Sequence, residues 1–323
     1  MLTAFLDGTA CVLTVCIMLA AGYWFEKKGW FHGEREDILA RLVVRVGLPC
    51  TVFYGFVSNF SRADLLSLGW GLGLPLIIVL SNIALSALLV RVFHVREGRR
   101  TPFIIAFSFS NAVFIGVPVV VALFGQEALP LSMLTFMVNT SIFWTLGIAL
   151  LRRESVQIHG EGDIPQDEPF YRKIVRLVQP ATAMFALAIA IILIGWTPPV
   201  FLMSAVQYLG NLVTPLSLVY SGAVIGRVGL RGLKPDRDTA LVLMGRFLWA
   251  PAAALLLTQF VPLPALTEKV IIMQLAMSVQ TQSTIVTGLY RLDAPFVIRC
   301  FTISTLMTFA MIPLYMMLFE LVF

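Results

Sequence analysis

Side chains that donate and accept hydrogen bonds interrupt a long apolar run at residues 107–125. Ser110 and Asn111 stand in a stretch that is otherwise hydrophobic enough to cross a bilayer, and Gly116 and Pro118 follow them. Proline lacks a backbone N–H and clashes with the preceding turn, so we expect the helix to be interrupted near Pro118. Freed backbone groups persist in hydrocarbon only where protein or a water-filled cavity satisfies them. This run is therefore a candidate binding site at membrane depth, and a proline-kinked packing helix is the alternative.

A second apolar run, 268–290, is unusually rich in amides and hydroxyls. Its polar residues include Gln274, Ser278, Gln280, Thr281, Gln282, Ser283 and Thr284. Burying such groups against lipid without partners is costly, so they should face a cavity or the protein interior. Gln280 and Gln282 lie about 200° apart around a regular helix, so either the helix breaks here or one amide serves packing. For any single residue, holding helices together remains the alternative.

Helices that break near the bilayer midplane would favour the binding of an anion. The N-terminal end of each half-helix carries partial positive charge and free N–H groups, which suit a carboxylate. Amides and hydroxyls would complete the hydrogen bonds, and Asn111 could either contact the substrate or clamp the opposite half-helix. Asn139, in the next apolar run, is a second buried amide with the same choice between binding and packing.

Acidic residues are missing from the middle of every apolar run. Asp7, Glu127, Glu268 and Glu320 lie toward the ends of their runs, and all three histidines lie in connections. Most proton-driven pumps and sodium/proton antiporters need a midplane carboxylate, so we expect neither that mechanism nor a buried histidine relay.

Three arginines, Arg41, Arg45 and Arg246, fall inside apolar runs. Each could attract an anion from the cytoplasm, or it could snorkel toward the headgroups, which is the interpretation that we favour. The four cysteines show neither metal-ligand spacing nor a disulfide framework, so we expect no metal and no cofactor. Hydrolase and nucleotide-binding motifs are also absent, so we do not expect an enzyme.

The apolar runs themselves indicate a polytopic membrane protein. Of 323 residues, 59% are hydrophobic and 13% are charged, whereas about 25% are charged in a soluble protein. Hydropathy, together with proline, glycine and charge punctuation, predicts ten membrane spans. They lie near 5–25, 36–57, 66–93, 101–124, 128–151, 174–196, 203–226, 238–261, 268–290 and 297–322.

Basic residues gather in the connections that follow the odd-numbered spans, and only Arg62 and Lys269 lie on the opposite side. The positive-inside rule then places those connections in the cytoplasm and both termini on the extracytoplasmic side. The net charge of +5 follows from this topology, so the partner that we expect is a lipid bilayer and not nucleic acid.

A polar linker, 152–173, divides the spans into five within 1–151 and five within 174–323. Because five is odd, the second half enters the membrane in the opposite orientation, and a duplication would give an inverted repeat. In both halves a proline, Pro49 or Pro215, is followed five residues later by a tyrosine. This echo favours duplication.

The stretch SNAVFIGVPVVVALFG, residues 110–125, resembles the signature of the auxin efflux carrier family. That family includes the plant PIN-type auxin exporters and bacterial permeases for malonate and related carboxylates. GLPCTVF around Pro49, TPLSLVYSGAVIG around Pro215 and Asn139 match as well. The family's pattern of Ala-Met-Pro followed by Thr-Asn corresponds to Ala-Met-Ser and Thr-Gln in the run 268–290.

The resemblance implies ten helices in two inverted five-helix repeats, with unwound helices 4 and 9 crossing at a central site. It also implies an elevator-like motion against a scaffold of helices 1, 2, 6 and 7. The family's site residues carry over onto Ser110 and Asn111 in helix 4 and onto Thr281 and Gln282 in helix 9. Ser278 stands where the family has proline and Gln282 where it has asparagine, which leaves the break in helix 9 and the substrate open.

We therefore expect an all-α polytopic protein of the cell inner (cytoplasmic) membrane, and the short central linker indicates a prokaryotic source. Its function would be that of a permease or efflux carrier for a small organic anion, such as a carboxylate. The predicted site comprises Ser110, Asn111, Asn139, Ser278, Gln280, Thr281 and Gln282, with Gly116 and Pro118 shaping the helix break. The alternatives are a proton- or sodium-coupled symporter or antiporter, and a channel-like or sensor protein. Substrate, direction, coupling and a homodimeric state stay open.

Overall fold

The computed structural model describes residues 2–31, 35–59, 61–62, 69–160, 180–228, 234–261 and 263–322. Within these ranges the regular elements are helices, joined by one isolated β-bridge, so the predicted all-α class is confirmed. Five helical stretches are long and apolar enough to cross a membrane. They are Leu72–Val92, Gln126–His159, Val200–Arg227, Arg237–Thr258 and Ala294–Val322.

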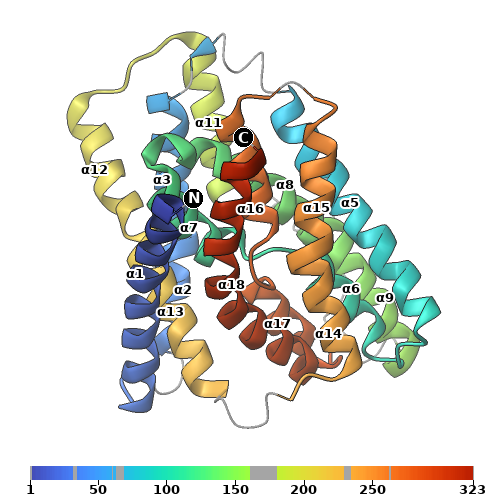
Figure 1. The fold of residues 1–323 in the computed structure, drawn as a ribbon. Coiled ribbons are helices and arrows are strands. Elements are labelled where there is room, and N and C mark those ends of the chain that lie inside the picture. The colour runs from blue at the N-terminus through green and yellow to red at the C-terminus, as the bar shows by residue number, and fades with distance from the viewer. Residues whose placement is uncertain are drawn as a thin grey trace.

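One side of the molecule consists of α1 (Leu2–Lys27), α2 (Arg35–Leu42), α3 (Leu48–Asn59), α11 (Pro180–Ile194), α12 (Val200–Asn211) and α13 (Val213–Val228) (Figure 1). Helix α1 packs along α13, while α3 packs along α11 and α12. A methyl group on Gly22 would meet the backbone of Val219, and one on Gly222 would meet the backbone of Leu19. Helices α1 and α13 therefore touch backbone to backbone, which only glycine permits at these positions.

The other helices are α5 (Gly69–Val92), α6 (Arg100–Ser108), α7 (Val117–Phe124), α8 (Leu129–Ile142), α9 (Ile148–His159), α14 (Arg237–Met244), α15 (Ala250–Thr258), α16 (Ala265–Leu275), α17 (Thr281–Leu289) and α18 (Ala294–Val322). Helix α9 continues to His159, so the first part of the predicted linker 152–173 is helical. The rest of that linker lies outside the described residues.

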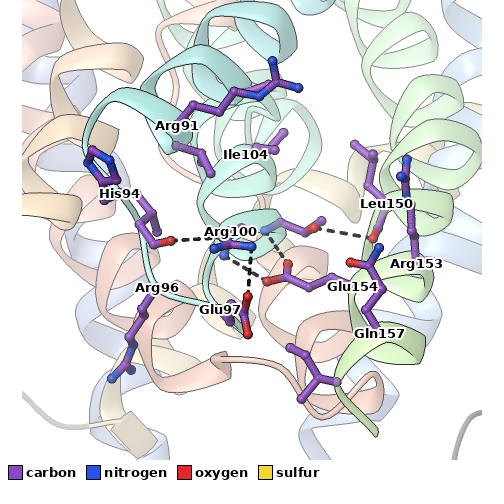
Figure 2. A pocket seen from close by; sticks show the side chains of 15 residues that line it. Arg91, His94, Arg96, Glu97, Arg100, Ile104, Leu150, Arg153, Glu154 and Gln157 are labelled. Atoms are coloured by element: carbon purple, nitrogen blue, oxygen red, sulfur yellow. Dashed lines mark hydrogen bonds and ion pairs between the residues drawn. The ribbon is translucent and has the colours of Figure 1, made fainter. Parts of the chain in front are cut away.

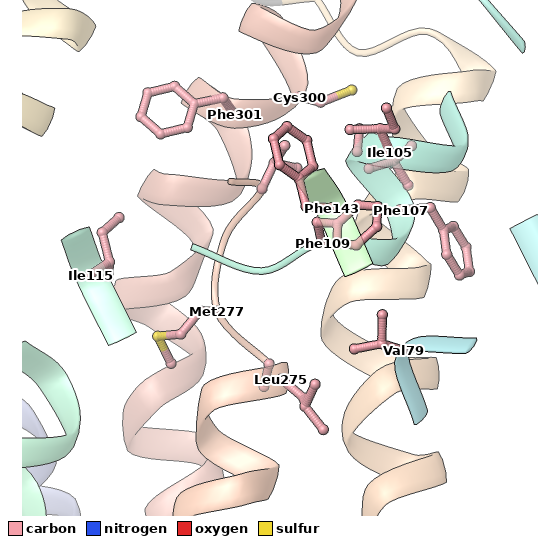
Figure 3. Close-up of a cluster of buried hydrophobic side chains, with 14 of the residues drawn as sticks. Val79, Ile105, Phe107, Phe109, Ile115, Phe143, Leu275, Met277, Cys300 and Phe301 are labelled. Atoms are coloured by element: carbon pink, nitrogen blue, oxygen red, sulfur yellow. The ribbon is translucent and has the colours of Figure 1, made fainter. Parts of the chain in front are cut away.

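Two clusters of buried apolar side chains hold these helices together. The larger cluster joins α5, α6, α16 and α18 and includes Phe107 and Phe301 (Figure 3). The smaller joins α3, α8, α11 and α13, and it includes Phe56, Phe114 and Tyr220. The rings of Phe114 and Tyr220 lie 5.4 Å apart. Helices α8 and α13 contribute to both clusters and so connect them, and the aromatic rings supply much of the buried apolar area.

Prolines widen the turn that precedes them in three of these helices. The widened turns are the π-helical segments η1 (Val43–Gly47), η2 (Ala112–Gly116) and η6 (Gly245–Trp249). Each ends two residues before a proline, namely Pro49, Pro118 and Pro251. A proline ring presses on the carbonyl four residues earlier, and that carbonyl lies inside the π turn in every case. Pro118 thus changes the winding of its helix without ending it.

Candidate functional site

Two interrupted helices cross at residues 109–111 and 276–280, which we call the crossing. Helix α6 ends before the first segment, and α16 and α17 flank the second. Asn111 N–H donates to the carbonyl of Ser278 at 2.8 Å, and Gln280 N–H donates to the carbonyl of Phe109 at 3.2 Å. These bonds flank an antiparallel bridge that includes Ser110. Backbone groups that leave one helix thus find partners in the other segment, as buried polar groups must.

The position of the first interruption differs from the expected one. It lies at 109–111, before Gly116 and Pro118, because Pro118 is accommodated by the π turn of η2. Gly116 is required for packing instead, because a methyl group at this position would collide with the side chain of Gln274. That amide donates a hydrogen bond to the hydroxyl of Ser132 on α8.

The second interruption forms although Ser278 stands there in place of a proline. Val279 N–H donates to the hydroxyl of Ser304 on α18 at 3.0 Å. Arg246, on η6, donates to the carbonyls of Leu275 at 2.5 Å and of Met277 at 2.9 Å. These two side chains satisfy backbone groups that an unbroken helix would pair internally, so the helix is opened by its neighbours.

Arg246 does not behave as its position in an apolar run suggested. Its side chain is 0% exposed, so the favoured interpretation that it snorkels to the headgroups is wrong. Besides its bonds to α16, its guanidinium donates to the carbonyl of Phe107, at the end of α6, at 3.2 Å. Arg246 thus links the C-terminal ends of both half-helices that lead into the crossing.

A small cavity lies beside the crossing, between η2, α8 and the start of α17. It is lined by Ser110, Asn111, Ala112, Val113, Phe114, Phe136, Asn139, Thr140, Gln280 and Gln282. Its volume of about 10 Å³ is close to that needed by one water molecule. A larger ligand would therefore require the surrounding helices to separate.

Amide side chains fix the backbone around this cavity. Asn139 brackets Ser110, accepting from its N–H at 3.2 Å and donating to its carbonyl at 3.0 Å. The amide of Asn111 donates to the hydroxyl of Thr281 at 3.0 Å, which fastens the two segments together by their side chains. The side-chain amide of Gln280, just before α17, donates to the amide oxygen of Gln282, in the first turn of α17, at 2.9 Å. The break between them explains how both amides reach one cavity.

Several polar atoms at the crossing are buried without a partner. They are the hydroxyls of Ser110 and Ser278 and the amide oxygens of Asn111 and Gln280. In addition, no side chain caps the N-terminus of η2 or of α17, and the first N–H groups of a helix have no partner within it. The cavity therefore presents donors from two helix ends and acceptors from side chains, and none of its lining residues is acidic.

The structure brings most of the predicted site residues together. Five of them, Ser110, Asn111, Asn139, Gln280 and Gln282, line the cavity directly. Thr281 is buried behind Asn111, to which it is bonded. Ser278 belongs to the crossing but is not among the cavity's lining residues.

Sequence reasoning missed Ser304 and Asn82 and misinterpreted Arg246. Arg246 and Ser304 hold the unwound backbone, and Asn82, on α5, is fully buried with both amide atoms unpartnered. Asn82 carried a readable signal, since it is an amide within the very apolar span Leu72–Val92. Ser304 carried none. Within the described residues, no group of histidine, cysteine or acidic side chains could hold a metal ion.

Four partly buried charges form what we call the rim cluster, at the arginine-rich end of the molecule. Arg99 lies 2.7 Å from Asp236, 3.1 Å from Asp238 and 2.7 Å from Asp293. The aspartates stand at the starts of α14 and α18, and Arg99 precedes α6. The rim cluster thus ties the same end of three helices together.

The arginines keep Asp236 and Asp293 ionised. Burial alone would raise the pKa of Asp236, but bonds from Thr239 and the charge of Arg99 lower its pKa to about 2. Burial likewise opposes ionisation of Asp293, yet Arg96 and Arg99 lower its pKa below the usual value. Asp236 and Asp293 therefore keep their negative charges at neutral pH.

A wide cavity lies near the same end, between the ends of α5 and α9, and has a volume of about 980 Å³ (Figure 2). Arg91, Arg100 and Arg153 line it together with Glu154. The Glu154 carboxylate accepts from the backbone N–H of Thr101, at the start of α6, which is the end of a helix that favours negative charge. No lining residue is shared with the cavity at the crossing.

Comparison with known proteins matches the chain along nearly its whole length. The sequence model of the family described as membrane transport protein matches residues 8–316. An uncharacterized transporter of Methanocaldococcus jannaschii is 23% identical over 316 residues, covering 94% of this chain and 96% of the relative. An uncharacterized transporter of Methanothermobacter thermautotrophicus is 23% identical over 315 residues, covering 96% and 98%.

Proposed function

Because the chain belongs to the membrane transport protein family, we propose that it carries a small organic anion, a carboxylate, by alternating access at the crossing. The predicted relationship to the auxin efflux carriers is confirmed, and with it a multi-pass membrane transporter and not an enzyme. The substrate class and the mechanism are the parts that we propose.

The observation that carries this proposal is the chemistry of the crossing cavity. The uncapped N-termini of η2 and α17 offer N–H groups and partial positive charge, which suit a carboxylate. The unpartnered oxygens of Asn111 and Gln280 accept hydrogen bonds, so a hydroxyl or N–H elsewhere on the anion would pair with them. An acidic side chain would repel such a ligand, and none lines the cavity.

The proposed architecture is two inverted five-helix repeats, residues 1–151 and 174–323, joined by the linker 152–173. The interrupted helices support it, because they are the fourth span of the first half and the fourth span of the second. Both termini would lie on the extracytoplasmic side of the cell inner membrane, as the distribution of basic residues indicates.

The proposed movement is that of an elevator, in which one body slides against the other. The helix packing supports a division into two bodies, because α3 packs along α11 and α12 whereas α5 packs along α6 and α8. The rings of Phe114 on η2 and Tyr220 on α13 lie 5.4 Å apart, and Phe114 also lines the crossing cavity, so the cavity would lie where the bodies meet. Separation there would admit substrate from one side at a time.

The membrane potential would supply the driving force for export. Moving one charge through 100 mV releases about 2.3 kcal/mol, and a cytoplasm-negative potential expels anions. The crossing cavity has no carboxylate that could bind and release a proton with each cycle. We therefore favour uncoupled, potential-driven movement over tight proton coupling.

Charge movement in proteoliposomes tests the proposal. A panel of mono- and dicarboxylates should include one that gives a saturable current without a proton or sodium gradient. Asn111→Ala should reduce that current by at least about tenfold, because it removes both a cavity amide and the clamp to Thr281. The matched control is Asn211→Ala, an exposed asparagine at the end of α12.

The outcomes separate clearly. Wild-type current in a folded Asn111→Ala variant would remove Asn111 from the site. Silence of the wild-type protein across the whole panel would overturn the anion proposal itself.

A further inference from the structure

The guanidinium of Arg246 is surrounded by backbone carbonyls in the interior of the protein. It donates to Phe107 at 3.2 Å, to Leu275 at 2.5 Å and to Met277 at 2.9 and 3.1 Å. Among the described residues, no carboxylate forms an ion pair with it. A buried arginine whose charge is met by carbonyl oxygens alone is unusual, because buried charges are normally paired with an opposite charge.

These carbonyls share one structural position. Phe107 lies in the last turn of α6, Leu275 ends α16, and Met277 follows it in the unwound segment (Figure 3). Carbonyls at the C-terminal end of a helix point outward unpaired and carry the negative end of the helix dipole. Two negative helix ends therefore converge on the guanidinium, one from each interrupted helix.

Converging carbonyls of this kind are the groups with which transporters that have broken helices coordinate sodium. A free cation would neutralise the two helix ends and hold the unwound backbone open. Arg246 performs both tasks here, with the difference that its charge is covalently attached and cannot leave. We propose that Arg246 is a built-in cation that stands in for a bound sodium ion and makes transport independent of sodium.

The opposite ends of the same segments explain why a fixed cation would suit this transporter. The positive helix N-termini at η2 and α17 face the anion cavity, while the negative C-termini of α6 and α16 face Arg246. Arg246 therefore balances the side of the crossing that does not bind substrate. This inference rests on the proposed function, because it assigns the ion coupling of that same site.

The first test is flux of the identified anion in buffers that contain either sodium or choline. Wild-type flux should be equal in both. Loss of wild-type flux on removal of sodium would overturn the inference and leave the proposed function standing. If neither buffer supports flux, the proposed function is overturned. The binding test below then decides whether Arg246 acts as a built-in cation.

The binding test uses Arg246→Ala and needs no transport. The variant leaves a space bounded by carbonyls, so its melting temperature should rise with sodium or with free guanidinium. Urea has the same shape as guanidinium without its charge and should give no rise. Where flux is measurable, the variant should lose about a hundredfold, the size typical when site groups shift by about an ångström, and guanidinium should restore part of it.

Controls make the result specific for this position. Arg237→Ala, at the exposed start of the same helix, should respond to none of the three additives. Equal effects of urea and guanidinium on Arg246→Ala, or no effect of any cation, would overturn the inference. If Arg246→Ala cannot be purified without an additive, guanidinium added during purification should rescue its yield and urea should not. Failure of guanidinium to rescue the yield would also overturn the inference.

Discussion

Two arginines join the same two segments of the molecule at different depths, and their partners differ in kind. Arg99, before α6, pairs with three aspartates at the starts of α14 and α18. Arg246, on the continuation of α14, bonds to carbonyls at the end of α6 and around the end of α16. Both therefore join α6 to the chain that begins with α14, once at the rim and once in the interior.

The difference shows which counter-charge suits each depth. At the rim, the ion pairs are partly exposed, and the arginines lower the pKa values of Asp236 and Asp293 so that both stay ionised. In the interior, a carboxylate would need a partner to avoid protonation, whereas carbonyl dipoles at helix ends carry their partial charge at every pH. The interior contact is therefore insensitive to acid on the partner side, while the rim cluster can be titrated.

Removing the interior arginine should have the largest effect on stability. Arg246→Ala leaves the carbonyls of Phe107, Leu275 and Met277 buried without a donor. We expect a loss of about 3–5 kcal/mol, as for a buried charged network that loses one member. Thermal unfolding in detergent, followed by tryptophan fluorescence, measures this loss. A loss no larger than that of Arg99→Gln would show that depth does not distinguish the two contacts.

Removing the rim arginine should have an intermediate effect. Arg99→Gln leaves Asp236, Asp238 and Asp293 close together without their shared cation, but water can reach them. We expect a loss of about 1.5–3 kcal/mol, in the range of hydrogen bonds to charged groups. The same unfolding measurement should show partial recovery in Arg99→Lys, which keeps the charge and loses the forked geometry. Equal losses in both variants would mean that geometry alone matters.

Acid should weaken the rim cluster selectively and by less than either substitution. The pKa of Asp236 is about 2 in the folded protein, below the value of about 3.9 in an unfolded chain. The unfolded state thus binds the proton more readily, so this contribution is complete above about pH 4 and is lost as the pH falls toward 2. Melting temperatures across this range should fall less steeply for Asp236→Asn than for wild type.

A parallel fall in both proteins would contradict that assignment. Asp293→Asn provides a second check, because the pKa of Asp293 is also lowered by its arginine neighbours. Its acid response should be flattened in the same sense.

The smallest effect on stability is expected at the start of α6, where the carboxylate of Glu154 accepts hydrogen bonds from backbone N–H groups. Glu154→Gln keeps one oxygen that can accept from the N–H of Thr101, replaces the oxygen that accepts from Gly98 with an NH₂ group, and removes the negative charge at the N-terminus of α6. We expect a loss of about 0.3–1 kcal/mol, the usual strength of a charge at a helix end. Glu97→Gln, on an exposed glutamate nearby, is the control. A loss of stability larger than that of Arg99→Gln would contradict this prediction.

Much of the fold followed from hydropathy because lipid demands long apolar helices. The predicted span 238–261 corresponds to Arg237–Thr258, and the span 297–322 to Ala294–Val322. The end of α9 was harder to place, since its last turns are polar. They stay helical because Glu154 is buried against the start of α6, a contact between residues far apart in the sequence.

The site could be located from the sequence, but its mechanics could not. Polar residues in apolar runs pointed to the segments around Asn111 and Gln280, since such residues need partners inside the protein. The first break was attributed to Pro118, and the second was left open, whereas the side chains of Asn139, Arg246 and Ser304 hold the unwound backbone. Arg246 was misread because one apolar run cannot reveal that carbonyls of two other helices converge on it.

The depth of Arg246 also has a consequence for the synthesis of the chain. A charged residue at the centre of a span raises the cost of membrane insertion by about 2.5–3.5 kcal/mol. Its partner Met277 lies 31 residues further along and is made roughly two to six seconds later at usual translation rates. Phe107 has already been made by then, so its carbonyl is the first partner available to Arg246. The crossing is therefore completed only after the chain has passed residue 280, and when a ribosome stalls before residue 275, Arg246 has the carbonyl of Phe107 but not those of Leu275 and Met277.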